Sequence, residues 1–227
     1  LTGREVSTNA GRFLESMAKP PGSPRAQVLP DRPGFEIHGR RLVSATSPDG
    51  ACQLGRDGDA STVSVDLPAR QGQALLEFDD GSGVLLPVIR GFVGVLRFHA
   101  RGLDEVWYEP ANEGDATLSR QELDFLRQAI SKASALGVFA LEGEDAGLLA
   151  SRMQNLKFQD PALAVYAAYA FHDIGQFRRI GQMQDFLRNQ LDVQLYDLAL
   201  LSRAFLREAG TGALVPSLPM LSQGWAL

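Results

Sequence analysis

Cysteine is almost absent from this sequence. Cys52 is the only cysteine among the 227 residues, so no disulfide can form within the chain. A lone cysteine is typical of compartments where thiols are kept reduced. The sequence therefore predicts a cytoplasmic protein.

Long apolar runs and an excess of basic charge are also missing. The nearest approach to a membrane span is DPALAVYAAYAF (160–171), which is shorter than the roughly 20 apolar residues that a transmembrane helix needs. Lys and Arg number 22 against 27 Asp and Glu, a formal net charge of −5. Nucleic-acid binders normally present basic surfaces to phosphate. We therefore expect neither a membrane nor a nucleic acid as partner.

The residue patterns of metal sites and of common hydrolases are absent too. His38, His99 and His172 lie far apart, and none has a second His or Cys at metal-ligand spacing, so we expect no metal and no cofactor. Cys52 follows SPDGA in a predicted loop, and a nucleophilic cysteine needs a nearby base that its spacing does not supply. A hydrolase using Cys52 and a histidine is kept as an alternative function, and a small-ligand-binding domain is another.

Strand signals dominate residues 34–110. Short runs rich in Val, Leu, Phe and Tyr are separated by turn sequences such as SPDG and DDGSG. TVSVDL (62–67) alternates apolar and polar residues, which predicts one buried face, and Leu96 and Phe98 are expected on the core side of a later strand. Because no helix signal interrupts these runs, the segment predicts an antiparallel β-sandwich or partly open barrel.

Helical signals dominate residues 111–227. Ser119 and Glu122 form a capping box, and Asp160 followed by Pro161 predicts an N-cap and the first residue of another helix. Short connections between the later helices favour antiparallel packing, hence a helical bundle. Further helices are expected over 146–157 and around 180–187 and 195–206, followed by an extended C-terminal tail. The fold class predicted for the whole chain is α+β.

The first 33 residues are predicted to be an N-terminal helix (1–18) and a proline-rich linker. Five prolines fall within residues 19–34, which favours an extended segment. Proteases bind exposed, extended chains, so Arg25 in this linker is a candidate cleavage site. The chain begins at Leu1 without a methionine, which favours a portion of a longer protein.

Several segments between residues 29 and 227 resemble a region of bacterial proteins that accompanies caspase-like or other protease domains. The segments are LPDRPGF, LLEFDDGSGVLLPVIRGFVGVLRF, VWYEP, DPALAVYAAYAFHDIG and PMLSQGWAL. The resemblance carries no catalytic residue, and the caspase His and Cys motifs are not present in this sequence. It implies a non-catalytic protein-interaction or regulatory module whose partner is a caspase-like protease. The chain would then be a substrate or a C-terminal part of that protease.

Overall fold

In the computed structural model, the described part of the chain comprises residues 32–99, 102–111, 122–127, 130 and 144–203. Strands come first and helices follow, as the sequence predicts, and residues 122–127 are also helical. The strands are β1 (Gly34–His38), β2 (Leu42–Thr46), β3 (Ala51–Asp57), β4 (Ala60–Asp66), β5 (Gln71–Phe78), β6 (Gly83–Ile89), β7 (Phe92–His99) and β8 (Gly102–Pro110). The later helical elements are α3 (Glu144–Leu156), α4 (Pro161–Asp173), α5 (Phe177–Phe186), the π-helical turn η1 (Leu187–Leu191) and α6 (Tyr196–Leu201).

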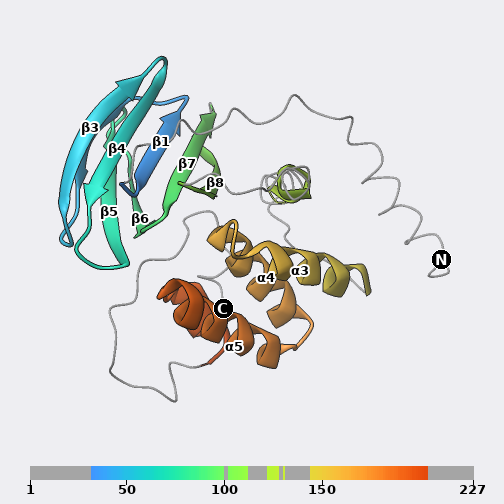
Figure 1. Cartoon of the computed structure of the whole chain (residues 1–227). Helices are drawn as coiled ribbons and strands as arrows, with labels where there is room; N and C mark the ends of the chain where they lie inside the picture. Colours follow the sequence, from blue (N-terminus) through green and yellow to red (C-terminus); the bar gives the residue numbers. More distant parts are fainter. Residues whose placement is uncertain (1–31, 100–101, 112–121, 128–129, 131–143, 204–227) are drawn as a thin grey trace.

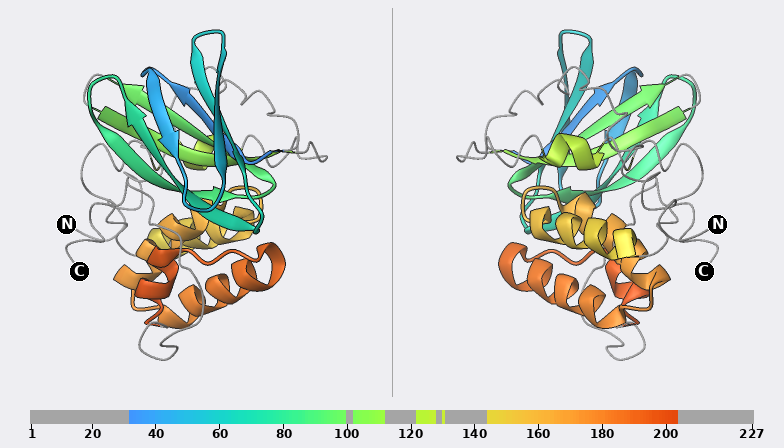
Figure 2. Two further views of the ribbon diagram at one scale, coloured as in Figure 1. Left: turned by 90° about the vertical axis from the view of Figure 1, so that its left-hand side faces the viewer. Right: turned by 90° about the vertical axis from the view of Figure 1, so that its right-hand side faces the viewer.

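The strands form two sheets and do not close into a barrel. A five-stranded sheet has the order β3-β4-β1-β7-β8, and a three-stranded sheet has the order β2-β5-β6. Figures 1 and 2 show the two sheets layered on one another, with α3, α4 and α5 gathered on one side of them. The predicted α+β class is confirmed in this form, as two sheets of mostly antiparallel strands combined with helices.

One strand pair departs from the antiparallel prediction. β1 and β7 run parallel, with Gly34 beside Val93 and His38 beside Arg97. A parallel pair needs a long connection between its strands. The whole three-stranded sheet and the β3–β4 hairpin lie between β1 and β7 in the sequence, and they supply that connection.

The predicted loop around Cys52 is wrong, because this residue lies in β3. The segment ACQLGRD lacks the β-branched and aromatic residues that mark strands in a sequence. It is extended because it pairs with β4 without a register shift, from Ala51 beside Asp66 to Asp57 beside Ala60. Gly58 makes the tight connection with a φ of 55°, in the left-handed region that glycine adopts without steric cost.

The main apolar core joins both sheets to the helices. Phe35 from the five-stranded sheet, Leu76 from the three-stranded sheet and Phe171 from α4 belong to one cluster of buried side chains. The rings of Phe78 and Phe98 meet edge to face across the sheets, with centroids 4.6 Å apart. The core positions predicted for Leu96 and Phe98 are confirmed.

A second, smaller apolar cluster lies on the other face of the five-stranded sheet. Val93 and Val95 from β7 join Trp107 and Ala111, and all four are buried. Alternation along β7 places Val93 and Val95 on the face opposite Leu96 and Phe98, so β7 is buried on both faces over part of its length.

Helix α4 is the central helix of the described helical part. Every residue from Pro161 to Phe171 is buried, and α3, α5, α6 and β8 all contact this helix. Its small alanine side chains allow such close approach. As predicted, Asp160 caps the helix, with Pro161 at the first position, where a missing N–H breaks no helical hydrogen bond.

Some predicted features lie outside the described residues. They are the N-terminal helix, most of the proline-rich linker with Arg25, the Ser119 end of the capping box, and the C-terminal tail. In the part of the chain that the structure does describe, no helix is long and apolar enough to cross a membrane.

Candidate functional site

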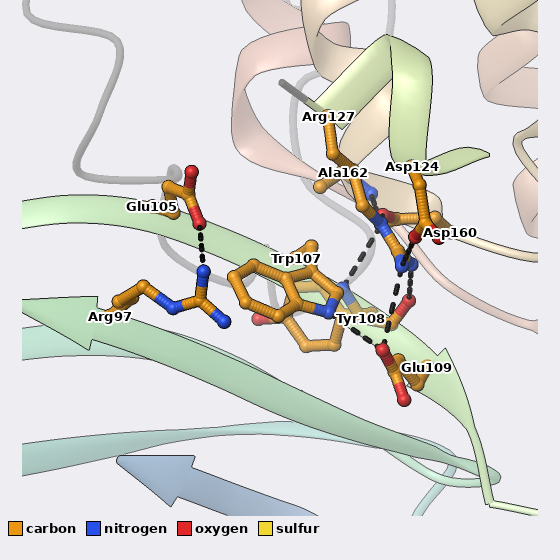
Figure 3. Close-up of polar contacts among 9 residues, drawn as sticks. All are labelled: Arg97, Glu105, Trp107, Tyr108, Glu109, Asp124, Arg127, Asp160 and Ala162. Atoms are coloured by element: carbon orange, nitrogen blue, oxygen red, sulfur yellow. Dashed lines mark hydrogen bonds and ion pairs between the residues drawn. The ribbon is translucent and has the colours of Figure 1, made fainter. Parts of the chain in front are cut away.

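A dense group of polar contacts lies where β8 meets the helices (Figure 3). At its centre is the carboxylate of Asp160, which is completely buried. Its Oδ1 accepts the backbone N–H of Ala162 at 3.0 Å, which caps α4, and the backbone N–H of Tyr108 at 3.1 Å. Its Oδ2 accepts from Nε of Arg127 at 3.0 Å. One side chain thus fixes α4, strand β8 and the helical segment 122–127 relative to one another.

Arg127 completes the connection from the helical segment to β8. Its Nη2 donates to the backbone carbonyl of Tyr108 at 2.9 Å, and its Nη1 lies 3.5 Å from Oε1 of Glu109. The same Oε1 accepts the indole N–H of Trp107 at 2.9 Å. Both backbone polar groups of Tyr108 that point away from the sheet are therefore bound by the Arg127–Asp160 ion pair.

Trp107 is contacted by two guanidinium groups. Arg97 lies 5.2 Å and Arg127 5.6 Å from the ring centroid, distances at which cation–π attraction operates. Arg97 also pairs with Glu105, its cross-strand neighbour on β8, at 3.5 Å. The two arginines and the nearby glutamates therefore balance their charges around one buried indole.

Burial controls the ionisation of this group. It raises the pKa of Asp160, while Arg127 and the amides of Tyr108 and Ala162 act in the opposite direction. Burial, followed by the proximity of Asp160, raises the pKa of the Tyr108 phenol well above its usual value. The phenol donates to the carbonyl of Pro87 at 2.7 Å and lies in the core. These contacts stabilise the junction between sheet and helices.

The structure gives the cysteine-hydrolase alternative no support. Cys52 packs against the main core, on the face of the five-stranded sheet that also carries Ile37 and Phe98. His38 and His99 alternate with those two core residues, so they lie on the opposite face. Burial also raises the pKa of the Cys52 thiol, which lowers its thiolate fraction at neutral pH.

His38 has a carboxylate partner on its own strand. Its Nε2 lies 2.6 Å from Oε1 of Glu36, and both side chains share one face of β1. Arg97 is the neighbour of His38 on β7. Across the described residues, no group of three or more His, Cys, Asp or Glu side chains is placed to hold a metal ion.

Exposed apolar side chains occur on the three-stranded sheet. Leu75 on β5 and Leu85 on β6 stand directly opposite each other, with 38% and 42% of their surface exposed. Both alternate with the core residues Leu76 and Leu86, so they lie on the outer face of this sheet. Val43 on β2 is 56% exposed as well, at the register shift between Leu42 and Ser44, and Thr46 is the β2 residue opposite Leu75. We call Leu75 and Leu85 the outer-face patch.

Sequence patterns found one residue of the junction and missed the others. The Asp-Pro sequence indicates the helix cap at Asp160, but no local spacing connects it with Arg127 or Tyr108. The alternation of strand residues indicates which side chains share a face, and it could have suggested that Arg97 and Trp107 lie on one side. Arg25, the candidate cleavage site, lies outside the described residues.

The chain was compared with protein-family models, with curated proteins and with solved structures. None of them matches it.

Proposed function

We propose that this chain is a non-catalytic protein-interaction or regulatory module associated with a bacterial protease of the caspase-like type. The observation that carries the proposal is the outer-face patch, which presents two directly opposite leucines to solvent on the paired strands β5 and β6. Apolar side chains exposed singly are normal on protein surfaces, whereas contiguous ones are typical of docking surfaces. In this proposal, α3 to α6 form an antiparallel bundle that supports the sheets.

The polar surroundings of the patch favour a specific protein partner. Glu77 on β5 and Ser44 on β2 are hydrogen-bonded to each other, and Glu77 lies two residues from Leu75 on the same face of β5. Protein interfaces commonly combine an apolar centre with a polar rim that fixes orientation. Leu75 and Leu85 would supply the centre, and Ser44 and Glu77 would lie in the rim.

The choice of a protease as partner follows from the resemblance of the sequence to regions that accompany protease domains. The chain would be the substrate of such a protease or its C-terminal part. The core-facing thiol of Cys52 agrees with a role in which this chain does no chemistry itself. The lone free cysteine also suits the cytoplasm as the place of this interaction.

A binding experiment tests the outer-face patch. The full chain is immobilised, and its affinity for the purified caspase-like protease of the same bacterium is measured with Leu75→Asp and Leu85→Asp variants. Each variant is expected to weaken binding at least about tenfold, because a carboxylate would be desolvated at the interface centre. Leu148→Asp, at a 63% exposed leucine on α3, is the matched control and should bind like the unaltered chain.

Two results would contradict this proposal. One is no binding of the protease by the full chain. The other is equal binding by Leu75→Asp, Leu85→Asp and Leu148→Asp, with circular dichroism confirming that all three are folded. Unchanged binding would move the proposed surface elsewhere and leave the partner in place, whereas absent binding removes the partner.

Incubation with the same protease tests the candidate cleavage site. A cut after Arg25 should release a short N-terminal peptide and leave a fragment that begins at Ala26, and Arg25→Ala should abolish this product. N-terminal sequencing of the large fragment locates the cut. An intact chain, or a cut elsewhere that Arg25→Ala does not affect, contradicts the predicted processing site.

A further inference from the structure

The edges of the two sheets differ in how they are protected. Edge strands carry backbone N–H and C=O groups that can pair with a strand of another chain, and proteins usually block them. At β8 the block is the ion pair already described: Asp160 accepts the N–H of Tyr108, and Arg127 donates to its carbonyl. These side chains occupy the place where peptide groups of a further strand would bind.

Both edges of the three-stranded sheet are also blocked. Strand β6 contains Pro87, which has no N–H, and its carbonyl accepts the phenol of Tyr108 at 2.7 Å. Strand β2 is only five residues long, and its register with β5 shifts between Leu42 and Ser44. A short strand with an irregularity is a poor template for another strand.

Strand β3 has none of these devices. It runs for seven residues without proline, and its register with β4 is unbroken. Among the described residues, no backbone hydrogen bond joins its outer edge to another segment. Figure 1 shows β3 as the outermost strand, on the side of the sheets away from α3. Leu54, at the middle of the strand, is 49% exposed.

We propose that β3 pairs with β3 of a second copy of this chain, antiparallel, about a two-fold axis at Leu54. This register pairs all seven residues, from Ala51 opposite Asp57 to Asp57 opposite Ala51. It joins the two five-stranded sheets into one continuous sheet. It also covers each Leu54 with the Leu54 of the other copy. Such an interface is closed, because each copy offers the same edge to the other.

The side chains of β3 are compatible with self-pairing in this register. On the core-side face, Arg56 stands opposite Cys52 of the other copy, so the two arginines do not oppose each other. On the outer face, Gln53 stands opposite Gly55, and its diagonal neighbour is Asp57 of the other copy. Gln53 accepts a hydrogen bond from Arg32 at 3.3 Å. Arg32 and Asp57 of the other copy, of opposite charge, would then lie on the same face close to Gln53, twice in the dimer.

The oligomeric state of the full chain tests the proposal. Sedimentation velocity from about 1 µM to about 1 mM protein covers the affinities of small interfaces. The unaltered chain is expected to form a dimer, and Leu54→Lys to raise its dissociation constant at least about tenfold, because two ammonium groups would face each other at the axis. Leu148→Lys, at an exposed leucine on α3, is the control and should dimerise normally. A chain that stays monomeric throughout, or a dimer that Leu54→Lys leaves intact, overturns the proposal.

Cysteine cross-linking tests the register itself. Opposite Cα atoms of paired antiparallel strands lie about 4.5–5.5 Å apart, within disulfide range. With Cys52→Ser as background and copper–phenanthroline in air as oxidant, Leu54→Cys should give a covalent dimer. Gln53→Cys should not, because its symmetry mates would be about 8 Å apart. Arg56→Cys should cross-link only when Cys52 is retained, because residue 56 stands opposite Cys52 of the other copy. A different pattern, such as efficient cross-linking through Gln53→Cys, rules out the Leu54 axis.

Discussion

At the residue scale, Asp160 connects three parts of the chain that are far apart in the sequence. Its two carboxylate oxygens bind the N-terminus of α4, the backbone of β8 and the guanidinium of Arg127. A buried charge is tolerated only where such partners replace water. Because the partners come from different elements, removing the carboxylate affects the helix cap, the strand edge and a buried cation together.

The first prediction is therefore a large loss of stability in Asp160→Ala. It leaves Arg127 buried without its partner, so the free energy of unfolding should fall by about 3–5 kcal/mol. Asp185→Ala removes a surface ion pair between Asp185 and Arg188 and is the control, with an expected loss of about 0.2–0.5 kcal/mol. Urea unfolding followed by circular dichroism measures both. A loss below about 1 kcal/mol in Asp160→Ala would mean that the ion pair does not hold the junction together.

Only part of this junction could be read from the sequence. The cap at Asp160 is a local feature, since the residue that it caps is two positions away. Arg127 is 33 residues from Asp160 and Tyr108 is 52, so these contacts depend on how whole elements pack. Local spacing contains no information about that packing. Arg127 was for the same reason missed as a candidate residue.

At the element scale, β7 fits between its neighbours because one of its residues has no side chain. A Cβ added at Gly94 would lie 2.5 Å from Cδ1 of Phe35 and 3.3 Å from Cε1 of Tyr108. The first distance is a steric clash with a ring in the core. The side chains of β1 and β8 thus occupy the space above Gly94.

The second prediction follows from this packing. Gly94→Ala should destabilise the protein by about 1–3 kcal/mol, because the ring of Phe35 must move in a filled core. Gly181→Ala is the matched control, since among the described residues no atom beyond its own stretch of the α5 backbone lies within 4 Å of an added Cβ. It should stabilise by about 0.5–1 kcal/mol, the usual gain when alanine replaces glycine inside a helix. Thermal unfolding of both variants checks the opposite signs, and a neutral Gly94→Ala would contradict the close packing.

The elements themselves show what a sequence can and cannot predict. Strands with apolar alternation, such as β4, were found because their pattern reflects a buried face. The sequence predicts a loop at β3 because its residues are mostly polar or small, and the extended conformation depends on pairing with β4. The parallel β1–β7 pair was missed since strand direction depends on the path of the chain between them. The conformation of β3 and the direction of the β1–β7 pair both depend on contacts between residues far apart in the sequence.

At the scale of the whole molecule, the two sheets and the helices share one apolar core. Side chains from β1, β5 and α4 belong to the same cluster, so the described strands and helices lose contacts together when any of them separates. Such a shared core favours cooperative unfolding in a single transition. The ionisation of a buried side chain should therefore change the stability of the whole protein.

The third prediction uses this cooperativity at alkaline pH. Burial is the main cause that raises the pKa values of Tyr108, Tyr166 and Tyr169 above the value of about 10 for an unfolded chain. Above pH 10 or so the unfolded state releases these phenolic protons while the folded state retains them. The contribution of these three tyrosines to the free energy of unfolding is therefore fully present below that pH and is lost as the pH rises. The loss approaches about 1.4 kcal/mol per pH unit for each of the three tyrosines.

Unfolding measured by circular dichroism at a series of pH values, together with tyrosinate ultraviolet absorbance, checks this dependence. The absorbance of these tyrosines should increase together with loss of structure. Tyr108→Phe should be less stable at neutral pH, because the carbonyl of Pro87 loses its donor. It should also show a shallower decrease of stability above pH 10 or so, because one fewer buried phenol titrates. Full tyrosinate absorbance in a chain that is still folded would mean that these phenols are open to water.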